Sequence, residues 1–243
     1  MTRTTRNVAP IHKPDNRPIS VIIPAAGCGR RMRSYGPRSL LKIKDNMTIL
    51  ENQIRCVNKY LYNPEIIIVS GFQSYKIENS ISNKKRNISI IDNKRWETTN
   101  IAASIALGVK KAKNKNILVI YGDLVFNAWT LRAPLGPYSL AIVDKKETMK
   151  KEEVGTTIVN NLVENMMFDL PNKWAQIAYF TGNEYSLLLN ICSQPQYYNR
   201  FGFEIINMII DGGGKFMAYS NPRMKITDID SSKDLCRIKD VLL

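Results

Sequence analysis

A series of short, β-branched, apolar runs, each followed by a segment with helical spacing, sets the strongest limit on the fold. Residues 19–23 and 65–70 are two such runs. Runs of this length and composition predict strands that are buried on both faces, as in a parallel sheet. Between them, Leu50, Ile54 and Val57 recur at helical spacing. The first half of the chain therefore predicts an open α/β sheet with right-handed crossovers.

The rest of the chain continues this alternation and then becomes less regular. We expect strands at 87–91, 116–123, 139–144, 156–159, 162–167 and 174–180, and helices at 99–113, 183–191, 200–210 and 231–243. We interpret residues 18–243 as one α/β domain with a Rossmann-like, mixed but mostly parallel open sheet flanked by helices. Residues 1–17 are predicted to be a flexible basic tail, and residues 145–220 a smaller lobe.

The chain is strongly basic, and several explanations fit its charge. Its 243 residues include 35 Lys and Arg against 21 Asp and Glu, a formal net charge of +14. Nucleic acid, small anionic substrates and a merely lysine-rich surface all agree with this balance. No recognised nucleic-acid-binding module is present in the sequence, so we do not expect nucleic acid to be the main partner.

The cysteines and the hydropathy pattern limit the compartment. Four cysteines are spread along the chain without C-x-x-C spacing, and His12 is the single histidine. This set favours neither a zinc site nor a disulfide framework, and it suits a reducing compartment. No apolar run approaches the roughly 18 residues of a membrane span, and the first residues have no apolar signal region. We therefore expect a cytoplasmic protein without a membrane span.

The loop after the first strand is rich in glycine and arginine. It contains Gly27 and Gly29, and arginines at positions 30, 31, 33 and 38. Small residues let the backbone approach a ligand closely, and successive backbone N–H groups form a nest for anions. The loop has neither the Walker spacing nor the dinucleotide fingerprint. It predicts a site for a polyphosphate.

Carboxylates stand at two other points where a metal site is expected. Asp123 follows an apolar strand that should end at the same sheet edge as the glycine loop. Asp228 and Asp230 alternate, so they share one face of a short strand. Mg²⁺ prefers hard oxygen ligands and takes one or two protein carboxylates together with phosphate oxygens. Asp234 has the spacing of a helix-capping residue after Ser231.

These motifs resemble a known family. The stretch Ala25-Ala26-Gly27-Cys28-Gly29-Arg30-Arg31-Met32, followed by Pro37-Arg38-Ser39-Leu40-Leu41, is similar to the signature of the nucleoside-triphosphate transferases. Residues 49–54, 93–104, 122–123 and 228–230 follow in the order of that family. The family includes nucleotide-sugar pyrophosphorylases and phosphocholine-cytidylyltransferase-like enzymes of the MobA-like fold. The resemblance covers nearly the whole chain.

The resemblance implies a role for each matching residue. It assigns nucleotide contacts to Ala25, Ala26, Gly27, Gly29, Arg31, Thr99, Asn100 and Ser104, catalytic contacts with phosphate to Arg31 and Arg38, and magnesium to Asp123 and Asp230. Arg38 stands where the family has lysine, and a planar guanidinium is not equivalent to a compact ammonium. The region that shapes the acceptor pocket in the family contains Trp174, Gln176, Tyr179 and Glu204.

The implied function is a magnesium-dependent nucleotidyltransferase. It would move a nucleoside monophosphate from a nucleoside triphosphate to a phosphorylated small molecule, such as a sugar phosphate or a phosphocholine-like compound, and release pyrophosphate. Two alternatives stay open. One is a catalytically inactive nucleotide-binding or structural protein on the same fold, which the change at Arg38 suggests. The other is a nucleic-acid-associated protein that uses its basic surface.

Overall fold

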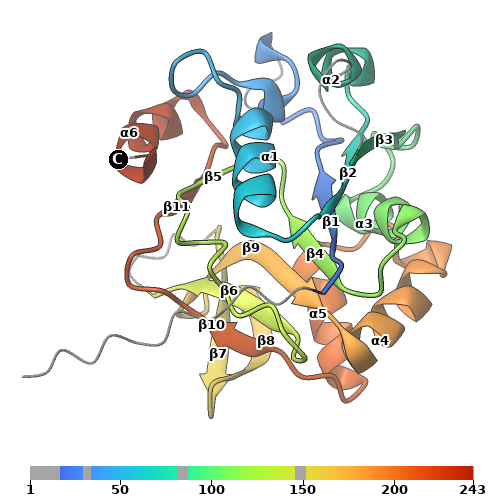
Figure 1. Ribbon diagram of the computed structural model, residues 1–243. Coiled ribbons are helices and arrows are strands. Elements are labelled where there is room, and N and C mark those ends of the chain that lie inside the picture. The colour runs from blue at the N-terminus through green and yellow to red at the C-terminus, as the bar shows by residue number, and fades with distance from the viewer. Residues whose placement is uncertain (1–16, 30–33, 82–86, 146–151, 243) are drawn as a thin grey trace, which may run out of the picture.

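The computed structural model describes residues 17–29, 34–81, 87–145 and 152–242. These residues form a nine-stranded sheet in the order β3-β2-β1-β4-β9-β6-β10-β8-β7 and a two-stranded sheet, β11-β5 (Figure 1). The strands span β1 Ser20–Pro24, β2 Glu65–Ser70, β3 Ile88–Asp92, β4 Ile117–Ile120, β5 Leu124–Phe126, β6 Leu140–Asp144, β7 Val154–Val159, β8 Leu162–Phe168, β9 Lys173–Phe180, β10 Met217–Tyr219 and β11 Ile226–Asp228. The α/β fold class predicted from the sequence is confirmed.

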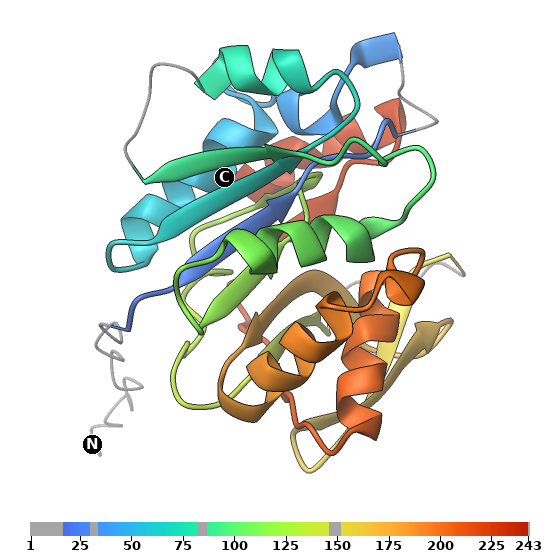
Figure 2. The same ribbon diagram turned by 90° about the vertical axis from the view of Figure 1, so that its right-hand side faces the viewer.

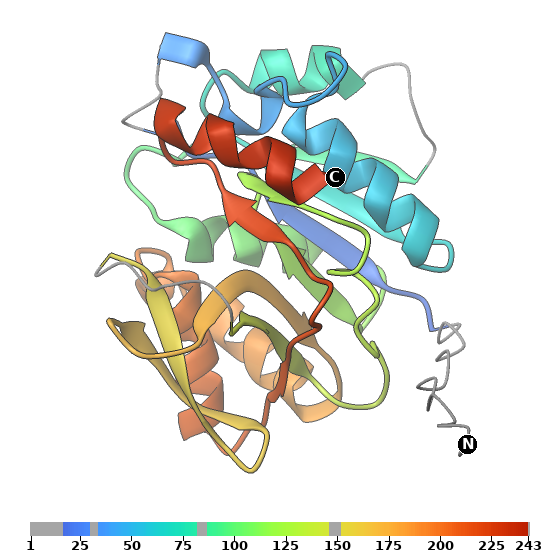
Figure 3. The ribbon, with the colours of Figure 1, turned by 90° about the vertical axis from the view of Figure 1, so that its left-hand side faces the viewer.

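Helices cover both faces of the large sheet. They span α1 Ile49–Tyr60, α2 Ser74–Ile81, α3 Ile101–Lys111, α4 Gly182–Cys192, α5 Gly202–Asp211 and α6 Ile238–Leu242. Helices α3, α4 and α5 lie on the face turned to the viewer in Figure 2, and α1 and α6 lie on the opposite side in Figure 3. One hydrophobic cluster lies beneath α1 and α2 and a second beneath α3, α4 and α5, while a third, smaller cluster joins α6 to β5.

The central strand β1 shows why the apolar runs become buried strands. Val21 and Ile23 belong to the cluster beneath α1, whereas Ile22 belongs to the cluster beneath α3. Side chains alternate between the two faces of a strand, so a strand covered on both sides must be apolar at every position. The three residues are fully buried. A continuous β-branched run in the sequence therefore indicates a central parallel strand.

The sheet changes direction between its two halves. Strands β3, β2, β1 and β4 are parallel, and β9 then pairs with β4 in the antiparallel sense. The predicted lobe at 145–220 forms the far half of this same sheet, with α4 and α5 packed on it (Figure 2). The two halves therefore share a continuous hydrogen-bonded sheet.

Two sequence predictions about local structure need correction. The predicted final helix at 231–243 is a 3-10 helix over Ser232–Arg237 followed by the short α6, with a capping box between Ser231 and Asp234 at its start. The strand expected at 116–123 ends at Ile120. The chain then turns and forms β5, whose partner β11 is far away in the sequence. A pairing of this kind leaves no local signal in the sequence.

Candidate active site

A cavity of about 720 Å³ opens beyond the carboxyl ends of β1 and β4. It is lined by both halves of the sheet, and its two ends differ in chemistry. Near β1 it is bordered by backbone and small polar side chains, and near β9 by aromatic side chains. Six carboxylates among the described residues line it: Asp123, Glu152, Glu153, Asp228, Asp230 and Asp234. Ligands of open α/β sheets bind at this edge.

The end of the cavity near β1 contains most of the predicted nucleotide contacts. Ala26, Gly27, Thr99, Asn100 and Ser104 line it. The side chain of Asn93, buried below them, donates to the hydroxyls of Thr99 (3.4 Å) and Ser104 (3.3 Å). Asn100 caps α3, because its side-chain oxygen accepts a hydrogen bond from the Ile101 amide at 2.8 Å. These hydrogen bonds thus hold the start of α3 at the cavity wall.

Two predicted nucleotide contacts lie outside the cavity lining, and a third is not among the described residues. Ala25 lies outside the cavity lining, where it packs against Gly122. Gly29 has a φ of 54°, and a Cβ there would lie 2.6 Å from the Arg38 side chain, so only glycine leaves room for Arg38. Gly29 also lies outside the lining. Arg31 lies outside the described residues.

Hydrogen bonds from helix α1 hold the turn that carries Asp123. The amide nitrogen of Gln53, a fully buried residue, donates to the carbonyls of Tyr121 and Leu124, both at 2.8 Å. On the other side of the turn, the Gly122 amide donates to the Pro24 carbonyl at 3.0 Å. A Cβ at Gly122 would lie 2.7 Å from that carbonyl, which explains the glycine. The carboxylate is therefore held close to the end of β1.

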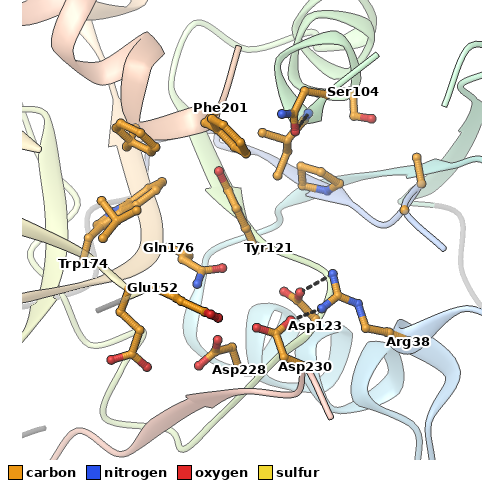
Figure 4. A pocket seen from close by; sticks show the side chains of 18 of the residues that line it. Arg38, Ser104, Tyr121, Asp123, Glu152, Trp174, Gln176, Phe201, Asp228 and Asp230 are labelled. Atoms are coloured by element: carbon orange, nitrogen blue, oxygen red, sulfur yellow. Dashed lines mark hydrogen bonds and ion pairs between the residues drawn. The ribbon is translucent and has the colours of Figure 1, made fainter. Parts of the chain in front are cut away.

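Arg38 connects the two carboxylates predicted to bind magnesium. It begins a one-turn 3-10 helix after Pro37. Its guanidinium lies 2.8 Å from Asp123 Oδ2 and pairs with Asp230 Oδ1 through its other terminal nitrogen (Figure 4). The Ile229 amide also donates to the Asp123 carbonyl at 3.1 Å. Residues from three distant parts of the sequence thus meet at one point.

Burial and charge shift the titration of this cluster. Burial raises the pKa of Asp123, and the neighbouring carboxylates Asp228 and Asp230 raise it further, while the positive charge of Arg38 opposes them. Asp123 raises the pKa of Arg38, so the guanidinium stays charged at every physiological pH. Burial also raises the pKa of the Tyr121 hydroxyl, which therefore stays protonated. Asp123 is consequently costly to ionise unless a cation stays beside it.

The residues present fit a magnesium ion. Asp123 Oδ1 is buried and has no hydrogen-bond partner among the described residues, so one carboxylate oxygen is left for a cation. Asp230 shares the Arg38 guanidinium with Asp123, whereas Asp228 pairs with Lys173 at 3.2 Å. The described residues contain no group of three His, Cys, Asp or Glu that could hold a metal ion. Two carboxylates suit Mg²⁺, which completes its shell with phosphate oxygens and water.

The end of the cavity near β9 is largely aromatic. Trp174 and Gln176 line it as predicted, and Tyr121 meets Trp174 edge to face at a centroid distance of 5.5 Å. Phe168, Phe201 and Phe203 form a mutual cluster at its rim. These phenylalanines are not among the residues predicted from the sequence, because the sequence does not distinguish a partly exposed aromatic residue from a core residue.

Two of the predicted acceptor contacts lie outside the cavity lining. Tyr179 is fully buried in the core beneath α1 and donates its hydroxyl proton to the Gly136 carbonyl at 3.2 Å. Glu204 accepts a hydrogen bond from the Phe201 amide at 2.6 Å and pairs with Arg200, so it caps α5. Neither residue lines the cavity. Both are explained by the alternation of strand faces and by capping chemistry.

Comparisons with known proteins match the first half of the chain to one family. Residues 21–141 match the MobA-like NTP transferase domain. The bifunctional protein GlmU of Francisella tularensis subsp. novicida is 32% identical over 107 residues, which are 44% of this chain and 22% of that protein. The chain thus spans about a fifth of the length of the curated relatives it matches. The part of the chain that carries the glycine loop and Asp123 thus matches a nucleoside-triphosphate transferase domain, as the resemblance indicated.

Solved structures extend the likeness to the rest of the fold. The CTP:phosphocholine cytidylyltransferase of Streptococcus pneumoniae superposes with a TM-score of 0.75 at 15% identity, over 92% of this chain and 98% of that one. The inositol-1-phosphate CTP transferase of T. maritima has a TM-score of 0.72 at 17% identity, over 92% and 97%. A putative glucose-1-phosphate thymidylyltransferase of Bacillus anthracis has a TM-score of 0.73 at 14% identity, over 91% of this chain and 94% of that one. At these identities the likeness shows the fold alone.

No helix within the described residues is long and apolar enough to cross a membrane.

Proposed function

We propose that the protein is a nucleotidyltransferase that moves a nucleoside monophosphate from a nucleoside triphosphate to a phosphorylated small molecule. The observation that carries the proposal is the cluster of Asp123, Arg38 and Asp230 at the sheet edge. It lines the same cavity as the backbone-lined end and the aromatic end. A reaction between two bound molecules needs such a charged centre between two binding sites.

The residues of the cavity support an in-line transfer. An oxygen of the acceptor phosphate would attack the α-phosphorus, forming the new P–O bond as the bond to pyrophosphate breaks. The acceptor phosphate is already ionised at pH 7, so no protein group has to remove a proton. The backbone around Ala26 and Gly27 would hold the nucleoside, and Arg38 would contact phosphate oxygens through its two terminal nitrogens. Catalysis would come from positioning and from fixed positive charge.

Asp123 and Asp230 would hold Mg²⁺, which neutralises phosphate charge during the transfer. For this, the guanidinium of Arg38 would exchange part of its contact with the two carboxylates for contact with phosphate. Both partners of such an exchange are oxyanions, so the guanidinium keeps its hydrogen bonds.

One observation favours a second candidate function, a nucleotide-binding protein without turnover. Arg38 already occupies one oxygen of each candidate metal carboxylate. If it stays there, phosphate is left without the positive charge that transfer needs, and a misplacement of 1 Å can lower the rate about 10²-fold. This candidate predicts nucleotide binding without pyrophosphate release.

Thermal unfolding with each of the four ribonucleoside triphosphates, with and without Mg²⁺, tests the proposal first. A ligand at 100 times its Kd adds about 2.7 kcal/mol to the stability of the folded state. For a chain of this size that raises the melting temperature by about 5–10 °C. We expect a Mg²⁺-dependent rise with one nucleotide, lost in Asp123→Asn but kept in the control Asp211→Asn, which changes an exposed carboxylate on α5.

Pyrophosphate release then separates the two candidates. With the stabilising nucleotide, phosphocholine, inositol 1-phosphate and glucose 1-phosphate are offered as acceptors. Release with one of them supports the transferase. A thermal shift without release under any of them favours the nucleotide-binding candidate, and no shift with any nucleotide contradicts both.

A further inference from the structure

Strand β9 contains an irregularity at the wall of the cavity. Its residue Ala178 pairs with Ala141 of β6, and Trp174 pairs with Val143. Three residues of β9 therefore lie opposite the single residue Ile142. Extra residues of this kind form a β-bulge, which turns a side chain in a new direction and is common beside active sites.

Gln176 is the middle residue of this bulge and has a left-handed backbone. Its φ is 56°. Most other non-glycine residues with positive φ in the described part of the chain are Asn or Asp in turns, where this conformation is tolerated. Gln176 lies inside a strand. A strained residue of this kind persists only where the surroundings hold it, and such residues cluster at functional sites.

Hydrogen bonds hold the bulge in place. The indole nitrogen of Trp174 donates to the Ile177 carbonyl at 3.3 Å, across Gln176. The Tyr121 amide donates to the Gln176 carbonyl at 3.4 Å, at the end of β4. The backbone of Gln176 is therefore fastened on both sides, which fixes the direction of its side chain.

The side chain of Gln176 points into the cavity. It lies between Trp174 and Asp123, where the aromatic end meets the charged cluster (Figure 4). No hydrogen bond of its amide group occurs among the described residues. The nearby carboxylates Glu153 and Asp228 have a partner in Lys173, at 2.9 and 3.2 Å. Gln176 thus presents a neutral donor and acceptor that the fold itself does not use.

We propose that the Gln176 carboxamide hydrogen-bonds the phosphorylated acceptor and sets which acceptors bind. This inference rests on the proposed function and names a residue for its acceptor half. A carboxamide can donate to a phosphate oxygen and can also bond a hydroxyl or carbonyl of the organic group. The strained backbone then orients the amide group toward the acceptor phosphate. That phosphate must lie there to reach the nucleotide.

Two variants of Gln176 separate this role from a structural one. Gln176→Met keeps the length of the side chain and the backbone strain but removes the hydrogen bonds. Gln176→Gly removes the side chain and also the strain, because glycine adopts positive φ without steric cost. The measurements are the melting temperature without ligand, and KM for the nucleotide and for the acceptor used by the wild type.

For Gln176→Met we expect an unchanged melting temperature, a nucleotide KM within about twofold of wild type and an acceptor KM about 10-fold higher, as for one hydrogen bond to a charged group. For Gln176→Gly we expect the same change in KM and a melting temperature about 2–4 °C higher. An acceptor KM unchanged in both variants, or a KM for nucleotide that rises equally, overturns the inference.

Failure of the proposed function has a different signature. If the wild type releases no pyrophosphate with any acceptor, the transferase proposal fails. Calorimetric titration with phosphocholine, inositol 1-phosphate and glucose 1-phosphate then tests Gln176 alone. Binding by wild type that is weakened about 10-fold in Gln176→Met supports its role in recognition. Equal binding by both proteins, or no binding by the wild type, overturns it.

Discussion

Arg38 and Asp123 are the residues on which the chemistry of the cavity depends most directly. Asp123 has a side-chain exposure of 13%, and Arg38 is the cation beside it. Burial nevertheless raises the Asp123 pKa, so Arg38 compensates the burial only in part. A buried carboxylate kept at a cost to the fold is typical of a group selected for function rather than stability.

This balance predicts how Asp123→Asn changes stability with pH. Well below pH 4 the carboxyl is protonated in both the folded and the unfolded chain, and the variant should match the wild type. As pH rises through the raised pKa of the folded state, the wild type must ionise a buried group and loses stability. We expect Asp123→Asn to be the more stable protein at pH 7. Urea unfolding between pH 2.5 and 7 measures the difference.

The control for this prediction is Asp211→Asn, an exposed position on α5. Its free energy of unfolding should follow the wild type at every pH. A less stable Asp123→Asn protein at pH 7 would mean that Arg38 compensates the burial completely.

At the scale of elements, helix α1 determines where Asp123 lies. Thr48 and Glu51 form a capping box at its start, and its fully buried Gln53 holds the turn between β4 and β5. Replacing Gln53 with Leu keeps the volume but removes this donor, so the Leu124 carbonyl loses its bond to Gln53 and the Tyr121 carbonyl keeps the Leu124 amide at 3.3 Å. A buried carbonyl without a donor costs about 1–3 kcal/mol.

We therefore expect Gln53→Leu to lower the free energy of unfolding by about 1–3 kcal/mol. Pyrophosphate release should fall as well, because the Asp123 turn loses its fastening. Arg55→Ala, on the exposed side of the same helix, should stay within about 0.5 kcal/mol of wild type. A Gln53→Leu protein with wild-type stability and activity would show that the strands alone hold the turn.

Helix α3 lies unusually close to β1. A Cβ at Gly108 would collide with the Ile22 side chain, which is fully buried in the sheet centre. We expect Gly108→Ala to lower stability by about 1–3 kcal/mol through overpacking, despite the higher helix propensity of alanine. Gly212→Ala is the matched control, because a Cβ there meets its neighbours at an ordinary 3.4 Å. A denaturant titration in which the two variants shift equally would contradict this.

At the scale of the molecule, one continuous sheet joins the two ends of the cavity. Strand β4 belongs to the parallel half and β9 to the other, and their backbones pair along the whole of β4. We propose that the described chain unfolds as a single cooperative unit. Variants that keep only Trp96 or only Trp174 as tryptophan place a probe in each half of the cavity wall.

The expected result is one urea transition with the same midpoint for both tryptophan probes and for far-UV circular dichroism. Two separate midpoints would show that residues 145–220 form a lobe with its own stability. In that case the cavity would lie between independently folding parts, and nucleotide binding should then stabilise the two parts to different degrees.

The local pattern of the sequence determined the parallel half of the sheet and its helices. Strands buried on both faces need continuous apolar runs. Asn100 and Ser231 are residue types that cap helices, and each lies at the start of a helix. Asp123 was expected at the sheet edge because a strand end is visible in the sequence.

Only the tertiary structure decided which carboxylate joins Asp123. Asp228 and Asp230 look equivalent in the sequence, but Lys173 takes one and Arg38 takes the other. The bulge that turns Gln176 inward and the pairing of β5 with β11 are equally invisible in local pattern. Periodicity reports how a segment contacts its nearest neighbours, whereas these features depend on contacts between segments many residues apart.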